Sequence, residues 1–170
     1  MAKDLKKKNV INAAIAGGAN FRGTAQAHIM LGSNPDGNGA HTGLHSLNTA
    51  AGHYPNLTEI RRIDTDARVP GIYSAEIRLT ASNDKGTKIS TFFPATMNWA
   101  AVRAAIVEAW EDGQINRTND IYVSMRNKYT LGMAGMATIG GQKIWVGSMQ
   151  TGSAASQIGT AFPAVNNKFI

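Results

Sequence analysis

Apolar residues recur with two different spacings along the chain, and the spacing predicts where helices and strands lie. Residues 4–16 have the three-to-four-residue spacing of a helix and end at two glycines. A second, short helix is predicted to start at Thr24, to carry His28 and to stop at Gly32. The glycine- and asparagine-rich residues 32–39 are typical of a loop.

The middle of the chain has the strict alternation of half-buried strands. Residues 73–80 alternate between apolar and polar side chains, and residues 83–86 have the composition of a turn. Residues 87–93 are therefore predicted to be the returning strand of a hairpin, which Pro94 ends.

A long amphipathic helix is predicted next, over residues 98–112. Asn98 or Thr96 is suited to cap its start, and Gly113 to end it. Short strands are predicted to follow at 121–125, in a hairpin that turns at Gly140-Gly141, and at 158–163. This order of elements predicts an α+β fold in which N-terminal helices pack on an antiparallel sheet.

The length and composition of the chain indicate a folded domain, and its charge indicates the kind of partner that it favours. At 170 residues it is long enough for one domain with its own core, and 43% of apolar residues excludes a disordered chain. The net charge of +6 favours a polyanionic partner or substrate. Because acidic residues end at Asp120, a positive C-terminal face is predicted from Arg126, Lys128, Lys143 and Lys168. The aromatic residues among them, which can stack on bases or pack between strands, are Tyr122, Tyr129, Trp145 and Phe162.

Several kinds of site are excluded by what the sequence lacks. It has no cysteine, and so neither a disulfide nor a thiolate nucleophile. We expect neither a membrane span nor a signal peptide, because no apolar run approaches the roughly 20 residues that cross a bilayer and the lysine-rich start has no clear cleavage site. Neither a phosphate-binding glycine loop with its lysine nor a serine nucleophile elbow is present.

Three of the four histidines, His28, His41 and His45, lie within 18 residues around the glycine-rich loop. Histidine titrates near neutral pH, so a pair can give and take a proton. The four-residue spacing of His41 and His45 would also suit zinc. However, Gly39 and Gly43 disfavour the helix that would place both on one face, and no HExxH motif is present.

Lys88, on the predicted hairpin, adds a cation to this set. Two histidines and one lysine are what metal-free RNA cleavage requires. One histidine removes the proton from the ribose 2′-OH, the other protonates the departing 5′-oxygen, and the lysine neutralises the phosphorane between these steps.

Four short motifs follow one another along the chain: Ala27-His28-Ile29-Met30-Leu31-Gly32, Gly43-Leu44-His45-Ser46-Leu47, residues 88–94 with the tryptophan-bearing helix after them, and Gly159-Thr160-Ala161-Phe162-Pro163. In their order and spacing they resemble the bacterial EndoU nuclease domain over about residues 24–165. That domain is the C-terminal toxin part of contact-dependent inhibition and similar polymorphic toxin systems. The resemblance implies the compact α+β fold shared with barnase-like, colicin-type and RelE-like ribonucleases.

The resemblance also implies roles for five residues. His28 matches the family's general acid, His45 its general base and Lys88 its lysine. Thr160 matches the threonine that binds the phosphate or base of the substrate. Phe162 stands where the family commonly has tyrosine, so it can stack on a base but cannot donate a hydrogen bond.

The second histidine can be matched in two ways. His41 and His45 each follow a short glycine-containing stretch that approximates the Gly-Gly-His of the family. We prefer His45, because Ser46-Leu47 follow it as in the family and because its distance in sequence from His28 is closer to the family's. His41 is the alternative.

These observations predict a metal-independent RNA endonuclease toxin that needs no cofactor, cleaves tRNA and leaves 2′,3′-cyclic phosphate ends. Residues 1–23 are expected to form a basic arm or linker, and residues 24–170 the nuclease domain. The resemblance further implies an upstream carrier protein, secretion or surface delivery into the cytoplasm of a target bacterium, and an immunity protein with an acidic surface. The alternatives are a non-catalytic basic module that binds RNA or DNA, and a structural β-rich domain with incidental histidines.

Overall fold

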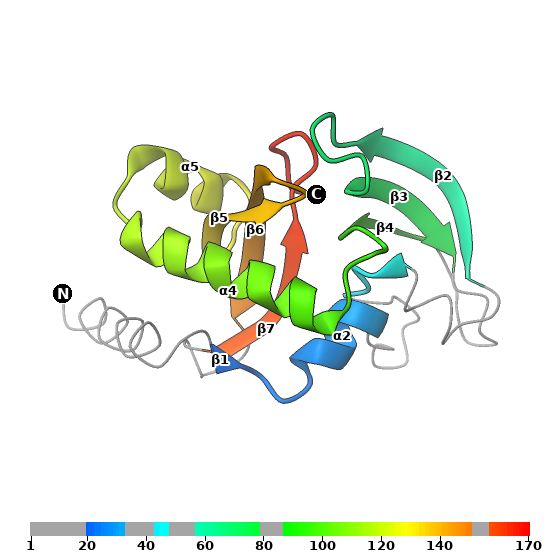
Figure 1. The fold of residues 1–170 in the computed structure, drawn as a ribbon, viewed down its shortest axis with the longest axis horizontal. Coiled ribbons are helices and arrows are strands. Elements are labelled where there is room, and N and C mark those ends of the chain that lie inside the picture. The colour runs from blue at the N-terminus through cyan, green and yellow to red at the C-terminus, as the bar shows by residue number, and fades with distance from the viewer. Residues whose placement is uncertain (1–19, 33–42, 48–56, 79–86, 151–156) are drawn as a thin grey trace.

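The computed structural model describes residues 20–32, 43–47, 57–78, 87–150 and 157–170 (Figure 1). The described helices are α2 Ala25–Leu31, α4 Trp99–Ile115 and α5 Asp120–Lys128. The described strands are β1 Asn20–Phe21, β2 Thr58–Thr65, β3 Tyr73–Arg78, β4 Thr87–Phe92, β5 Met133–Ile139, β6 Gln142–Gln150 and β7 Gln157–Pro163. The helix predicted at 4–16, the loop after Gly32 and the turn at 83–86 lie outside the described residues. No described helix is long and apolar enough to cross a membrane.

The strands form two sheets, and the fold is of the predicted α+β class. One sheet has the order β1-β7-β6-β5, with β1 parallel to β7 and the other pairs antiparallel. The other sheet is antiparallel, with the order β2-β3-β4. The predicted helix at α2, the β3–β4 and β5–β6 hairpins and the last strand β7 are confirmed. The division of the chain at residue 23 stays a prediction.

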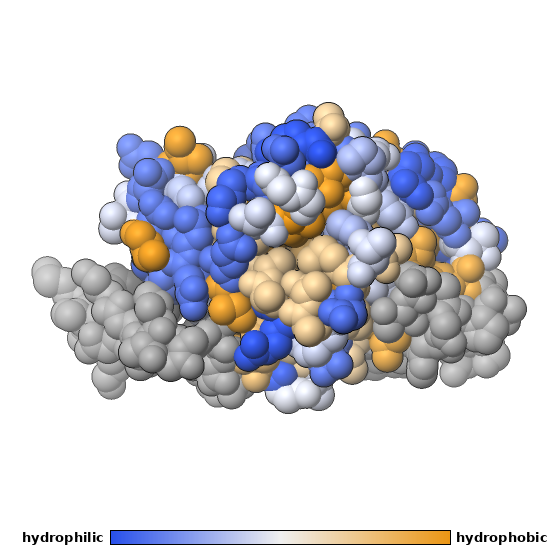
Figure 2. All heavy atoms as spheres, viewed as in Figure 1, coloured by the Kyte–Doolittle hydropathy of each residue, from blue (hydrophilic) through white to orange (hydrophobic). Residues whose placement is uncertain are grey.

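Helix α4 lies across the four-stranded sheet and packs closely on β5 (Figure 1). Asn98 caps its start, as predicted, since the Ala101 amide donates to Asn98 Oδ1 at 3.0 Å. The prediction that Gly113 ends the helix is wrong: Gly113 lies inside it, and a β-carbon there would be 2.5 Å from the Ala134 carbonyl oxygen. Glycine at position 113 therefore allows α4 to pack closely on β5. Ala100, Ala101 and Ala104 of α4 are exposed, and Figure 2 shows a pale orange area over this helix.

Helix α5 takes the place of the strand predicted at 121–125, which is wrong. The Asn119 side chain accepts a hydrogen bond from the Ile121 amide at 3.0 Å and so caps the helix. Asp120 lies in the first turn and two basic residues lie in the last, an order that the helix dipole favours. Alternation over only five residues does not distinguish a strand from a helix. Here the side-chain cap and the charges at the two ends of the segment favour the helix.

The two sheets enclose separate cores and meet where β4 lies against β7. The larger core is formed by the inner faces of α2, α4 and the four-stranded sheet. The smaller core lies between the three-stranded sheet and residues 43–47, and consists of Leu44, Tyr73, Ala75, Ile77 and Phe92. Side chains from both sheets therefore come together at the β4–β7 junction.

A buried carboxylate ties the two sheets together. Asp66, just after β2, is fully buried, and its oxygens accept hydrogen bonds from the Arg68 amide at 2.9 Å and the Val69 amide at 3.0 Å. They also accept one from the Asn166 amide at 2.8 Å, which lies in the segment after β7. The carboxylate thus joins the end of β2 to the chain that leaves the other sheet.

Replacing Asp66 with alanine is expected to lower the free energy of unfolding by about 3–5 kcal/mol, because three backbone amides, that of Val69 buried and the other two partly buried, would lose their acceptor. Urea unfolding followed by circular dichroism measures this loss. The matched control is Glu59→Ala, since Glu59 holds an exposed ion pair with Arg62 whose loss should cost less than about 1 kcal/mol. Equal losses of unfolding free energy in the two variants would contradict the role of Asp66 in joining the two sheets.

Candidate active site

A pocket of about 300 Å³ opens at the β4–β7 junction. Its walls come from α2, residues 43–47, β4, β6 and β7, and the C-terminal residue closes one side. It is lined by His28, Gly43, His45, Lys88, Ile89, Ser90, Thr91, Met149, Thr160, Phe162 and Ile170. The structure therefore brings into one pocket all five residues to which the sequence assigns a role, from four distant parts of the chain.

The chain at Gly43 runs against α2 and fixes the two histidines relative to each other. The Leu44 amide donates to the His28 carbonyl at 3.0 Å, and the His45 amide donates to the Ile29 carbonyl at 2.6 Å. A β-carbon on Gly43 would lie 2.0 Å from the His28 carbonyl oxygen, and its φ of +73° is in the left-handed region that favours glycine. Glycine at this position is therefore what allows the approach.

The His45 ring is held by β4 in one tautomer. His45 is only 7% exposed, and its ring Nδ1 lies 2.7 Å from the Thr91 carbonyl oxygen. Because a carbonyl can only accept, Nδ1 carries the hydrogen and donates it, which leaves Nε2 with its lone pair. The Ser90 hydroxyl donates to the Leu44 carbonyl at 2.8 Å and fixes the backbone beside the ring. This geometry makes His45 a proton acceptor through Nε2.

Burial and nearby cations keep both histidines neutral. Burial, with a smaller effect of the Lys88 ammonium, lowers the pKa of His45 to about 3. Partial burial, Lys88 and Arg22 also lower the pKa of His28 from its ordinary value. At neutral pH His45 is thus ready to accept a proton, whereas only a minor fraction of His28 carries one.

Lys88 is the cation at the centre of this pocket. Its Nζ donates to the carbonyl of Gly43. Burial lowers the pKa of Lys88 to about 8, so the ammonium is still charged at neutral pH. Within the described part of the chain no carboxylate forms an ion pair with it. Its charge is therefore available to an anionic ligand.

Two residues of β7 complete the pocket. Thr160 and Phe162 alternate along the strand, so both side chains point to the same side. The Thr160 hydroxyl is buried and has no hydrogen-bond partner among the residues that the structure describes, which is costly unless another group supplies one. The Phe162 ring lies with its centroid 5.4 Å from that of His45, at an interplanar angle of 34°. A hydrogen-bond donor and a flat apolar surface thus lie beside the histidine.

Part of the site has no signature in the sequence. Thr91 holds His45 through its backbone carbonyl, which every residue possesses, so its residue type does not reveal the contact. Ser90 acts through its hydroxyl, but the carbonyl that accepts from it belongs to Leu44, 46 residues away in the sequence. Gly43 stands in a recognisable Gly-Leu-His motif, but its contact with His28 depends on tertiary structure. His41 lies outside the described residues.

The C-terminal cations and aromatic residues divide between several places. Tyr122 packs edge-on against Trp145, with centroids 4.7 Å apart, and Tyr129 packs in the same way against Phe169. These rings form a small core under α5 and do not line the pocket. Lys143, expected on a positive face, forms a 2.9 Å ion pair with a glutamate of α4. Of the four aromatic residues considered as base-stacking rings, Phe162 alone lines the pocket.

The pocket has the groups for acid–base chemistry on an anion. It offers one proton acceptor, a second histidine, an ammonium that no described carboxylate pairs with, and a hydroxyl without a described hydrogen-bond partner. In the described part of the chain no three histidine, aspartate or glutamate side chains are grouped in a way that would hold a metal ion. A phosphodiester fits this set, because its charge would meet Lys88 while its oxygens exchange protons with the histidines.

Comparison with known proteins agrees with this chemistry. The family model for the bacterial EndoU nuclease matches residues 22–165. No curated protein and no solved structure matches the chain, so the likeness to barnase-type ribonucleases stays a prediction. The matched residues include the whole lining of the pocket apart from Ile170. A match over most of the chain, with the acid–base pocket inside it, places the protein in the bacterial EndoU nuclease family.

Proposed function

We propose that the protein is a metal-independent RNA endonuclease that cleaves tRNA and leaves 2′,3′-cyclic phosphate ends. The observation that carries the proposal is the His45 ring, whose Nδ1–H is donated to the Thr91 carbonyl while Nε2 keeps its lone pair, in a pocket shared with His28 and Lys88. The family assignment favours a nuclease over a non-catalytic binding module.

The proposed reaction is an attack within the substrate. His45 Nε2 removes the proton from a ribose 2′-OH, and the 2′-oxygen forms a bond to the adjacent phosphorus. The bond from phosphorus to the 5′-oxygen then breaks, and protonated His28 gives its proton to that oxygen. Lys88 and the Thr160 hydroxyl stabilise the negative charge on the phosphoryl oxygens between the two steps. The products are a 2′,3′-cyclic phosphate and a free 5′-OH.

A first experiment is to incubate the protein with total tRNA in EDTA and to separate the products by size. Discrete tRNA fragments are the expected result. Retarded but intact RNA would support a binding module, and cleavage that appears only when a divalent ion replaces the chelator would contradict the proposed chemistry. A DNA copy of the same sequence, which has no 2′-OH, is expected to stay intact.

The pH dependence of cleavage follows from the site. His28 must be protonated and its pKa is lowered below 6.5, so kcat/KM is expected to fall with rising pH from a point below 6.5, about tenfold per unit. The fall should steepen above about pH 8, where Lys88 loses its charge. His45 stays neutral above about pH 3, so no rising limb is expected between about pH 5 and 7. A rising limb there would show that the base is another group.

We also propose that this nuclease is the toxin part of a larger secreted or surface-delivered protein, acts in the cytoplasm of a target bacterium, and is blocked by an acidic immunity protein. The net charge of +6 and the cationic pocket support a negatively charged inhibitor. Expression of the chain in a bacterial cytoplasm is expected to stop growth with loss of intact tRNA. Growth arrest that persists unchanged in the His45→Ala variant would contradict toxicity by cleavage.

A further inference from the structure

Exposed apolar side chains gather at the pocket that holds the two histidines and Lys88. Among the described residues, seven large apolar side chains are exposed, and three of them, Ile89, Met149 and Ile170, line this one pocket. Ile89 is 44% exposed and Met149 is 41% exposed. Apolar surface that stays exposed in a pocket, next to charged groups, is typical of a place where a ligand packs.

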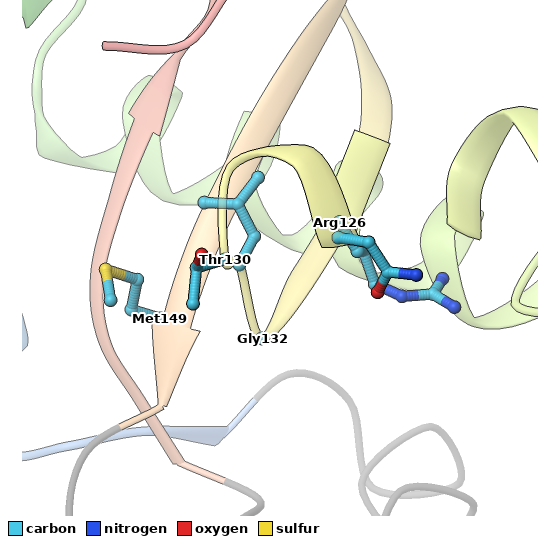
Figure 3. Close-up of a pocket in the computed structure, with 6 residues that line it drawn as sticks. Arg126, Thr130, Gly132 and Met149 are labelled. Carbon is cyan, nitrogen blue, oxygen red and sulfur yellow. The ribbon is translucent and has the colours of Figure 1, made fainter. Parts of the chain in front are cut away.

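Met149 extends the wall that β7 contributes to the pocket. It pairs in register with Thr160, and cross-strand partners point to the same face of a sheet. Met149 also lines a second pocket at the end of α5, and Figure 3 shows its side chain directed away from Arg126, toward the side on which β7 lies. Its thioether therefore adds apolar surface beside the pocket residues of β7.

Ile89 belongs to the wall that β4 contributes. It follows Lys88 directly, and the next two residues contact the His45 ring. The Thr91 carbonyl oxygen lies 2.7 Å from His45 Nδ1, and Ser90 Oγ lies 3.2 Å from the same atom. Ile89 is therefore next to both the cation of the pocket and the strand residues that hold the proposed base.

The Phe162 ring, in contrast, already packs against the protein. It lies against the His45 ring, and it meets the Phe169 ring edge-on, with centroids 5.7 Å apart and an interplanar angle of 83°. Phe162 is also less exposed than Ile89 or Met149. Much of the apolar surface that remains for a ligand is thus supplied by these two aliphatic side chains.

The chemistry of a nucleotide indicates what would pack there. Its phosphate is charged and its ribose carries hydroxyl groups, whereas the faces of its base are flat and apolar. In the proposed reaction His45 takes a proton from a ribose 2′-OH, and the base on that same ribose is attached nearby. Ile89 and Met149 lie on the strands that flank the contacts of His45 with Thr91 and Phe162.

We propose that Ile89 and Met149 bind the base of the nucleotide upstream of the cleaved bond, the one whose 2′-OH is deprotonated. The two side chains pack on this base and so position its ribose for His45. The proposal rests on the proposed RNA cleavage and assigns substrate contacts to two residues outside the acid–base set.

Three short RNAs that contain the mapped cleavage bond test this base site. The first is intact, the second lacks the base upstream of the bond but keeps that ribose with its 2′-OH, and the third lacks the base downstream. Wild-type kcat/KM is expected to fall at least about tenfold when the upstream base is removed, within the range for one base packed on protein side chains. Removal of the downstream base is expected to have the smaller effect.

Substitutions then show whether these two side chains cause the difference. The ratio of kcat/KM on the intact RNA to that on the upstream base-free RNA is expected to fall to about threefold in Ile89→Ala and in Met149→Ala, since each variant loses part of the apolar contact. Met149→Leu, which keeps an apolar side chain of similar volume, is expected to restore the ratio, whereas Met149→Gln is expected to behave like the alanine variant.

The matched control is Ile60→Ala. Ile60 is 40% exposed on β2, in the same sheet as Ile89, and does not line the pocket. Its replacement removes the same amount of exposed side chain and is expected to leave the ratio at the wild-type value.

The outcomes separate the base site from the proposed function. If the wild-type protein cleaves neither the intact RNA nor tRNA, the proposed function fails and the base site with it. Equal cleavage of the intact and the upstream base-free RNA would show that the base site is wrong while the nuclease stands. The same conclusion follows if the variants change the preference for the downstream base instead, or if Ile60→Ala lowers the ratio as much as Met149→Ala.

Discussion

Replacing His45 with alanine is expected to reduce RNA cleavage by at least about 100-fold, the usual contribution of one positioned general base. The Nδ1–H donation to the Thr91 carbonyl leaves Nε2 as the proton acceptor. His28→Ala is expected to cause a loss of similar size, because the leaving oxygen would have no proton donor. Initial rates on a defined tRNA fragment measure both losses.

The matched control for this pair is His41→Ala, which removes a histidine from the same part of the sequence. It is expected to retain activity near that of the wild type. Full activity of His45→Ala together with an inactive His41→Ala would assign the base to His41, and activity in all three variants would contradict acid–base catalysis by histidine. Thermal unfolding of each variant shows whether a lost activity reflects lost structure.

Lys88→Ala is expected to lower kcat by about 100-fold or more with little change in KM. A donor directed at the developing charge stabilises the transition state more than the bound substrate, and its removal therefore appears in kcat. Lys88 lies close enough to both histidines to lower their pKa values, and no carboxylate among the described residues forms an ion pair with it, which supports this role. Steady-state kinetics on a single-site RNA substrate give kcat and KM separately.

The control for Lys88 is Lys143→Ala, because Lys143 is exposed and paired with Glu108 away from the pocket. It removes the same charge and is expected to change neither constant by more than about twofold, in line with the small effect of surface charges. A rise in KM at unchanged kcat in Lys88→Ala would show instead that Lys88 is a binding contact for the RNA backbone.

The elements that the sequence predicts correctly are those with a long, clear period or a strong turn signal. Strand β3 alternates over its whole length, and the glycines at 140–141 turn the β5–β6 hairpin with positive φ values. The pattern does not predict β2, since its residues Thr58–Thr65 are largely exposed on both faces and its pairing with β3 is interrupted by two irregularities. Helix α5 is missed because its apolar residues are few and a side-chain cap starts it.

The candidate site can likewise be predicted from the sequence only in part. Side-chain chemistry and motif order point to His28, His45 and Lys88, and the structure brings these residues together with Thr160 and Phe162. What the sequence does not reveal is how they are held. The tautomer of His45 depends on a backbone carbonyl of β4, and the position of His28 depends on the close approach of Gly43 to α2. Such contacts arise only when distant segments pack.

The most direct test of the central claim is the fate of an RNA in which a single ribose, at the mapped cleavage position, is replaced by 2′-deoxyribose. The unmodified RNA, incubated in EDTA, is expected to give a 2′,3′-cyclic phosphate on the upstream fragment and a 5′-OH on the downstream one, both identified by mass spectrometry. The modified RNA is expected to stay intact at that position, since His45 would have no 2′-OH to deprotonate. Cleavage of the modified RNA at the same bond, or a 5′-phosphate on the downstream fragment, would contradict the account.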